Sequence, residues 1–389
     1  MGARQISSLL AGLALTGLLA SCGSSGTTAR APSATQPART TQPAAAGQLE
    51  VTRIGEATID HEAWKRLGYR WAWAGYPKTA PGAAITEIDA YEDRVITRDT
   101  ATVVSVLNAS TGRMIWGTEM DRPETKVLGV VRDGDTVLVS TETELHEVAI
   151  ESGNLLSRSS FGKLINTEPV LNGNLAIYGT LDGELFALNR DTGLPLWRYG
   201  VGESFESKPI LLNPYTLFCV TQDGKVATIN LSGPSAISVL EISGGLANNP
   251  VSDLYYTVIA SQDRSVYCFA EGQRIWRYRT SERLTVQPVI YQDRVYFASP
   301  KLGVVCLNAA TGEQVWSQPS LPNGWIVGSH GGELIAWTGV VLATLDPENG
   351  DVIAAAELPG LSGIQTDRFE DGSLYGVAGR GTVLRFDPR

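Results

Sequence analysis

A short segment recurs through most of this chain at an interval of about 40 residues. Three of its copies read LNASTGRMIW, LNRDTGLPLW and LNAATGEQVW, so that a glycine follows an Asn by four residues and precedes a Trp by four. The repeated glycines are spaced 38–41 residues apart: Gly112, Gly153, Gly193, Gly233, Gly272, Gly312 and Gly350. A period near 40 is typical of repeat architectures, including propellers whose blades are four-stranded sheets.

Between these glycines the sequence shows the pattern of short β-strands. A second set of markers, Pro169, Pro209, Pro250 and Pro288, runs in phase and precedes apolar runs, as expected for prolines at strand starts. Asp-Gly and Asn-Gly pairs, which favour tight hairpins, separate the apolar runs. No long segment of helical period is found between residues 82 and 389. Each repeat is therefore predicted to form four antiparallel strands, and the fold to be all-β.

The Trp position of the repeat is occupied in only some copies. It holds Trp116, Trp197, Trp276 and Trp316 in four repeats, and Ser157, Ile237 and Ala354 in the other three. The glycine suits a turn that needs positive φ, and the Asn side chain can bond to that turn. We interpret the four Trp side chains as structural wedges between neighbouring blades, with a ligand-binding role as the alternative.

The repeat count predicts an eight-bladed propeller. Seven copies carry the glycine, and an eighth copy, residues 368–389, stops before its fourth strand. We expect YRWAWAGYP (69–77) to supply that strand, with Trp71 or Trp73 in the Trp position. Such an exchange would close the ring and remove its open strand edges. A seven-bladed ring is the rival interpretation.

The first 21 residues have the layout of a secretory signal peptide, with Arg4 followed by an apolar run from about residue 9 to residue 20. The run is too short for a membrane span. It ends in LASC (19–22), which resembles a bacterial lipobox and implies cleavage before Cys22 and acylation of its thiol. An ordinary secretory signal is the alternative.

The residues after Cys22 are predicted to form a disordered tether up to residue 48. They consist of Gly, Ser, Thr, Ala, Pro and Gln with two Arg, and such a segment has too little apolar surface to fold. The domains are thus expected to be a signal peptide (1–21), a lipidated Cys with its tether (22–48) and a propeller (49–389). Lipid chains on Cys22 would hold the protein at a membrane.

Composition argues against several kinds of site. The net charge of -10 disfavours nucleic acid, which is bound by clustered Lys and Arg. The three His are far apart in sequence, so no metal site is expected. No two of the four Cys are adjacent, and Cys219, Cys268 and Cys306 lie in apolar runs typical of buried thiols, with one disulfide left open.

The motif Ala/Asn-x-x-Thr-Gly-x-x-x-Trp resembles the tryptophan-docking repeat of pyrroloquinoline-quinone-type propellers, over about residues 69–389. One branch of that superfamily contains quinone-dependent dehydrogenases, which carry two adjacent cysteines and a calcium site. This chain has no Cys-Cys pair, and its repeats leave little room for pocket-building loops. The other branch, the BamB-type lipoproteins of the outer-membrane β-barrel assembly machinery, has no cofactor and fits better.

This resemblance implies a lipid-anchored scaffold without catalytic residues or cofactor, facing the periplasm from the outer membrane; Gly23 after Cys22 is consistent with that membrane. The expected partner is the barrel-forming subunit of the assembly machinery, reached through loops between blades. VGESFESKPI, from Val201, is the counterpart loop. Phe205 and Trp325 are the candidate partner contacts, unless each folds back over its own blade. A quinone-dependent dehydrogenase and a ligand- or polysaccharide-binding propeller are the alternatives.

Overall fold

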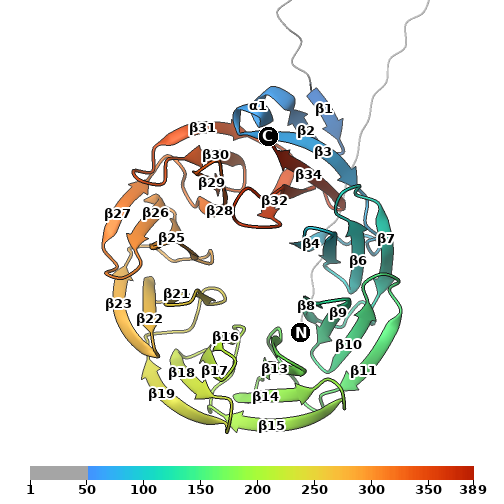
Figure 1. Ribbon diagram of the computed structural model, residues 1–389, viewed down its shortest axis with the longest axis vertical. Coiled ribbons are helices and arrows are strands. Elements are labelled where there is room, and N and C mark those ends of the chain that lie inside the picture. Colours follow the sequence, from blue (N-terminus) through green and yellow to red (C-terminus); the bar gives the residue numbers. More distant parts are fainter. Residues whose placement is uncertain (1–50) are drawn as a thin grey trace, which may run out of the picture. The chain divides into compact units, whose positions relative to one another are not determined.

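The computed structural model describes residues 51–389, which form a ring of eight four-stranded antiparallel sheets (Figure 1). The single α-helix in this range has six residues. The predicted all-β, eight-bladed propeller is confirmed, and the seven-bladed alternative is wrong. The signal peptide, Cys22 and the tether lie outside the described residues. Within residues 51–389, no helix is long and apolar enough to cross a membrane.

In blades one to seven the strands follow chain order from the centre of the ring outward (Figure 1). Blade 1 contains β4 (Ile85–Ala90), β5 (Arg94–Asp99), β6 (Val103–Asn108) and β7 (Met114–Glu119). Blade 2 contains β8 (Val127–Asp133), β9 (Thr136–Thr141), β10 (Glu144–Ala149) and β11 (Leu155–Ser160). Blade 3 contains β12 (Val170–Asn172), β13 (Leu175–Gly179), β14 (Glu184–Asn189) and β15 (Leu194–Gly200). Blade 4 contains β16 (Ile210–Asn213), β17 (Thr216–Val220), β18 (Lys225–Asn230) and β19 (Ser235–Glu241).

The second half of the ring continues in the same way. Blade 5 contains β20 (Val251–Ser252), β21 (Thr257–Ser261), β22 (Ser265–Ala270) and β23 (Gln273–Arg279). Blade 6 contains β24 (Val289–Tyr291), β25 (Arg294–Ser299), β26 (Gly303–Asn308) and β27 (Gln314–Gln318). Blade 7 contains β28 (Trp325–His330), β29 (Glu333–Trp337), β30 (Val341–Leu345) and β31 (Val352–Glu357). Blade 8 contains β32 (Leu361–Thr366), β33 (Leu374–Ala378), β34 (Thr382–Pro388) and, from the other end of the propeller, β3 (Tyr69–Gly75).

Blade 8 is completed as predicted. Strand β3 pairs antiparallel with β34, from Tyr69 opposite Pro388 to Gly75 opposite Val383. The last strand of the chain therefore has a partner along its length, and the ring has no open blade edge at the junction of its two ends.

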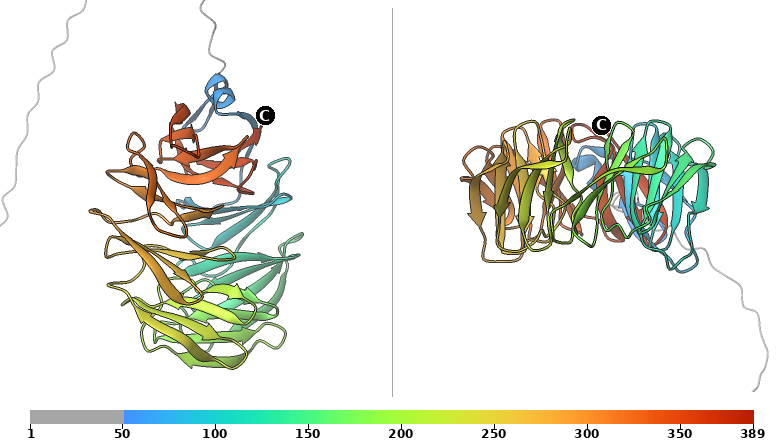
Figure 2. Two further views of the ribbon diagram at one scale, coloured as in Figure 1. Left: turned by 60° about the vertical axis from the view of Figure 1, so that its left-hand side comes forward. Right: turned by 90° about the horizontal axis from the view of Figure 1, so that it is seen from below.

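Because neighbouring strands are antiparallel, the connections alternate between two sides of the ring, seen edge-on in Figure 2. One side, here called the loop side, carries the connections from blade to blade, such as 201–209, and those between the second and third strands. The opposite side, the turn side, carries the repeated glycine turns, such as 109–113. Candidate contacts on different loops can therefore be assigned to a side from strand order alone.

The repeated Trp and Gly belong to one contact between neighbouring blades. The Trp276 indole N–H donates to the Ala309 carbonyl at 2.7 Å, and a Cβ on Gly312 would lie 2.6 Å from that indole. Gly312 also has φ +72°. Trp73, Trp116 and Trp316 dock in the same way on Gly112, Gly153 and Gly350, with N–H···O distances of 2.7–2.9 Å. The glycine is thus required both by the turn and by the ring that packs on it.

Trp197 is an exception among the predicted structural Trp residues. It is partly buried against the core between blades 3 and 4. The strand register places Pro234 where the other turns have glycine, one residue after Gly233. Proline cannot adopt positive φ, and nothing lies within 4 Å of a Cβ built on Gly233. The expectation that Gly233 is equivalent to the other turn glycines is therefore wrong.

The same one-residue offset changes the Trp position of blade 4. Ser238 pairs with Thr228 just as Trp276 pairs with Cys268, so that Ser238, and not Ile237, stands in this position. Spacing counted from Gly233 therefore selected the wrong residue. Ser157 and Ala354 do occupy the equivalent register in their blades.

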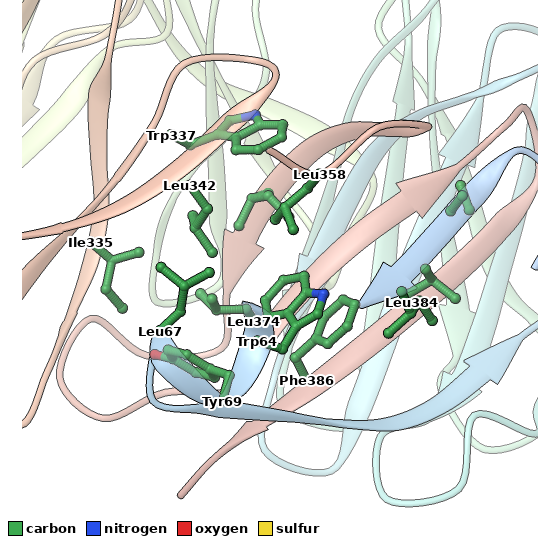
Figure 3. Packing of buried hydrophobic residues seen from close by; sticks show 14 residues of the cluster. Trp64, Leu67, Tyr69, Ile335, Trp337, Leu342, Leu358, Leu374, Leu384 and Phe386 are labelled. Atoms are coloured by element: carbon green, nitrogen blue, oxygen red, sulfur yellow. The ribbon is translucent and has the colours of Figure 1, made fainter. Parts of the chain in front are cut away.

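A hairpin and a helix that precede the repeats complete the junction of blades 7 and 8. They are β1 (Val51–Ile54), β2 (Ala57–Asp60) and α1 (His61–Arg66), whose first turn is capped by the Asp60 carboxylate. Trp64 of α1 stacks on Phe386, with ring centroids 3.5 Å apart (Figure 3). Ala354 packs against the same cluster, so Trp64 supplies the bulk that blade 7 lacks in its Trp position. The repeat pattern does not predict this helix.

Candidate interaction surfaces

Phe205 lies in the predicted loop between β15 and β16 but has no exposed surface. Its side chain packs between blades 3 and 4 with Ile177 and Leu217, and a Cβ on Gly179 would lie 2.5 Å from it. The Phe205 carbonyl also accepts a hydrogen bond from the Asn166 amide at 2.6 Å. The structure contradicts the assignment of Phe205 as a partner contact, because burial in the core leaves it nothing to offer a partner.

Trp325 begins β28, the innermost strand of blade 7, and is partly buried against the cluster around Trp64 and Trp337. Together with residues of the inner strands β20, β24 and β32 it lines a cavity of about 450 Å³. Trp325 is therefore directed toward the centre of the ring, and the fold does not bring it together with Phe205. A partner contact by Trp325 stays a prediction.

The loop that contains Phe205 contributes to a polar hollow on the loop side of blades 4 and 5. This hollow has a volume of about 310 Å³. Its lining residues are Glu206, Ser207, Thr221, Gln222, Leu246, Ala247, Asn248, Asn249 and Gln262. Only Glu206 among them is titratable, so the hollow offers amide and hydroxyl groups for hydrogen bonds but no acid–base pair.

The loop beneath this hollow is held by an ionised carboxylate. Glu203 accepts a hydrogen bond from the Thr221 hydroxyl at 2.7 Å and lies 3.3 Å from the Lys225 ammonium. The hydrogen bond from Thr221, followed by the interaction with Lys225, lowers the pKa of the Glu203 carboxyl. This arrangement fixes the loop rather than preparing a reactive group.

An arginine-rich groove adjoins the polar hollow on blade 5 and shares Gln262 with it. The groove has a volume of about 680 Å³, and its charged lining residues are Asp263, Arg264, Arg277, Arg279 and Arg283. Arg277 is paired with Asp263 at 2.7 Å. Within residues 51–389, the guanidinium groups of Arg279 and Arg283 form no hydrogen bond or ion pair. Four cations and one anion make this groove positive on a chain of net charge -10.

One cluster with metal-ligand residue types occurs elsewhere. Asp121, Glu144 and His146 each place a ligand atom within 4.8 Å of the others. Glu144 already accepts hydrogen bonds from Arg158 and His146, and the hydrogen bond from Arg158 lowers its pKa most. Glu144, His146 and Arg158 thus form an ion-pair network of blade 2, and Asp121 lies beside it in the connection before β8.

The three cysteines of the propeller are free and buried, as their apolar surroundings predict. Burial raises the pKa of the Cys219, Cys268 and Cys306 thiols to about 12. Each is therefore a neutral thiol at physiological pH and a poor nucleophile.

Asp89 on the inner strand β4 has the most perturbed carboxyl group of the described residues. Burial, followed by the charges of Glu87 and Glu168, raises the pKa of Asp89 to about 7, and Lys208 and Arg98 oppose this rise. Its ordinary value is 3.8. Between these two values the folded chain retains a proton that the unfolded chain has released, so the free energy of unfolding decreases as pH rises through this range.

We expect Asp89→Asn to remove this pH dependence. At pH 8 the variant should be more stable than the wild type by about 1–2 kcal/mol, because the buried charge is gone. At pH 4 the two proteins should differ little. Thermal unfolding from pH 4 to pH 8 measures the effect, with Asp135→Asn on an exposed turn as control. Parallel pH profiles for Asp89→Asn and wild type would contradict this account.

Most of the propeller matches a known protein family. Residues 99–237 and 235–371 match two copies of a family model described as outer membrane protein assembly factor BamB. The matches together cover more than half of the chain. The chain belongs to the BamB family. Comparison with curated protein sequences gave no match.

Solved structures agree with this fold. BamB from Moraxella catarrhalis has a TM-score of 0.65 at 18% identity, with 82% of this chain and 97% of that chain covered. The computationally designed Ika8 protein reaches 0.65 at 14% identity, with coverages of 78% and 96%. The C-terminal WD40 domain of Sif2 reaches 0.65 at 10% identity, with coverages of 82% and 98%. At these identities the likeness concerns the fold alone.

In this BamB-family chain, the loop from Val201 adjoins an arginine-rich groove that the sequence pattern did not reveal. Arg277 and Arg279 stand two residues apart on β23, and the fold gathers them with Arg264 and Arg283. The segment RIWRYR (274–279) contains a signal for this grouping. Residues two apart on a strand point to the same face, so Arg277 and Arg279 are expected to lie side by side.

Proposed function

We propose that this protein is a membrane-anchored scaffold that binds other envelope proteins during assembly and insertion of outer-membrane β-barrel proteins, without catalysing a reaction. The observation that carries the proposal is the match to the BamB family over residues 99–371. The polar hollow and the arginine-rich groove support it, since both offer binding groups without an acid–base or nucleophilic set.

The proposed attachment is through lipid on Cys22, at the periplasmic side of the outer membrane. The segment 23–48 would then let the propeller stand away from the lipid surface. The proposed partner is the barrel-forming subunit of the assembly machinery. We place its contact on the loop side of blades 4 and 5, where amide groups adjoin the guanidinium groups of Arg279 and Arg283, which suit an acidic partner surface.

Affinity capture from detergent-solubilised envelopes tests this function. The tagged full-length protein should recover a large outer-membrane barrel protein. Arg279→Glu combined with Arg283→Glu should reduce that recovery about tenfold, because two exposed cations become anions at the proposed contact. Arg113→Glu combined with Arg380→Glu, at exposed positions outside the groove, is the matched control and should recover normal amounts.

Two results would count against the proposal. Recovery of cell-wall material alone would reject a role in barrel assembly. Equal losses of recovered barrel protein for the groove pair and the control pair would show that the contact does not lie on blade 5.

A further inference from the structure

A second, apolar cavity opens between blades 4 and 5 toward the turn side. Its volume is about 740 Å³, within the range of small-molecule and side-chain binding sites. Aromatic and aliphatic side chains form most of its wall, including Phe218, Phe269, Ile237, Ile275, Leu254 and Tyr255. It is lined by different residues from the polar hollow and the arginine-rich groove.

The repeat explains why this cavity exists. At four other blade junctions an indole from the outer strand fills the corresponding space and donates to a backbone carbonyl of the next blade. Blade 4 has Ser238 in that register. The Ser238 hydroxyl donates to the Gly272 carbonyl at 3.0 Å, but a serine is much smaller than an indole. The space that an indole fills elsewhere, here called the tryptophan slot, is therefore only partly filled. The Ser238 and Thr228 hydroxyl oxygens lie 2.9 and 3.0 Å from a Cβ built on Gly272, and the cavity remains open beside them.

Both walls of the slot keep features suited to an aromatic ring: Gly272 belongs to blade 5, and Thr228 to β18 of blade 4. Gly272 has φ +73° and no side chain, like the glycines under the four docked indoles. The Thr228 hydroxyl oxygen is buried without a hydrogen-bond partner in the described part of the chain, and would lie 3.0 Å from a Cβ on Gly272. Val106 and Cys268 hold the Thr228 position in blades 1 and 5. An indole N–H needs such an acceptor when it is buried.

The rim of the slot consists of large apolar side chains that are exposed to solvent. Leu254 is 92% exposed and Tyr255 is 75% exposed, and both belong to the connection between β20 and β21. Neighbouring Ile237 is 58% exposed. Apolar side chains gathered around an open pocket are typical of a binding surface and are costly to leave in water.

We propose that the open part of the tryptophan slot binds an aromatic side chain, preferentially an indole, presented by another polypeptide. The chain's own docked indoles show which group fits between two of its blades. The segment outside the structure cannot supply that group, because residues 1–50 contain no Trp, Tyr or Phe. The occupant therefore comes from a different chain. This inference does not depend on the identity of the partner proposed above.

Titration with 5-fluoro-N-acetyltryptophanamide, followed by ¹⁹F NMR line broadening, tests the slot directly. The wild type should bind with a Kd on the order of 0.1–1 mM, and N-acetylalaninamide should not compete. Ser238→Trp should abolish binding, because the new indole fills the slot from within. It should also raise Tm by a few degrees, which shows that the variant is folded.

A second pair of variants keeps the test independent of Ser238. Leu254→Ser with Tyr255→Ser should weaken binding at least about fivefold, since both side chains are exposed walls of the cavity. Leu194→Ser with Leu196→Ser removes a comparably exposed apolar pair from blade 3, outside the cavity, and should leave binding unchanged.

Any of three binding results would overturn the proposal, and so would one result on self-association. The binding results are retained binding in folded Ser238→Trp, competition by N-acetylalaninamide, and equal effects of the two serine pairs. Self-association of the wild type that Ser238→Trp removes would instead identify the slot as a contact between copies, and would also overturn it. Loss of indole binding leaves capture through the arginine-rich groove testable, so failure of either proposal can be recognised separately.

Discussion

Gly312→Val is expected to destabilise the propeller by roughly 3–5 kcal/mol. A Cβ on Gly312 would lie 2.6 Å from the Trp276 indole, so the ring would have to leave its position between blades 5 and 6. A β-branched residue is also strained at φ +72°. Removal of the indole in Trp276→Ala should cost a similar amount, because it leaves a cavity in a packed junction.

Gly233→Val is the matched control for this prediction. Gly233 occurs in the same repeat, yet it lacks positive φ and has nothing within 4 Å of a Cβ. Its loss of stability should stay within about 1 kcal/mol. In urea unfolding, the costs of Gly312→Val and Trp276→Ala should also be clearly less than additive. Equal losses for the two glycines would contradict the docking explanation.

Loss of β3 should have the other large effect. A chain beginning at residue 76 lacks the strand that pairs with β34, the Trp73 hydrogen bond to Ala109, and the Trp64 ring that stacks on Phe386. Strand β34 would then present an unpaired edge, which favours aggregation. We expect either no soluble monomer or a Tm lower by more than about 15 °C, measured by size-exclusion chromatography and circular dichroism.

A chain beginning at residue 49 provides the control, because it removes the preceding segment and keeps β1, β2, α1 and β3. It should remain monomeric with the Tm of the full-length chain. Addition of residues 49–76 as a separate peptide should restore part of the lost stability in the shorter chain. A monomer beginning at residue 76 with unchanged Tm would show that the ring does not require this closure.

The architecture was predictable from sequence because it depends on spacing. The interval near 40 residues sets the blade, and an incomplete eighth repeat requires a strand from elsewhere, which 69–77 supplies as β3. The contribution of Trp64 could not be predicted in this way, because α1 lies outside the repeat and contacts it only after the ring closes. The periodicity of the sequence predicts only the repeated blades, and the contact of Trp64 at the junction of blades 7 and 8 occurs once.

The errors arose where counting along the chain differs from strand register. Pro234 occupies the glycine position of its turn, so Gly233 and Ile237 were each assigned one residue too early. Phe205 was correctly placed in a loop between two blades, yet its side chain turns into the core. Which side a loop occupies follows from strand order, whereas the direction of one side chain depends on packing against Gly179 and its neighbours.

Site-specific photo-crosslinking in intact cells tests the central claim most directly. A photoreactive amino acid at Gln222, in the polar hollow of the loop side, should form an adduct with a large outer-membrane barrel protein. The same group at Glu348, exposed on the turn side of blade 7, should not. The account would be contradicted if Gln222 formed no such adduct, or if both positions gave the same products.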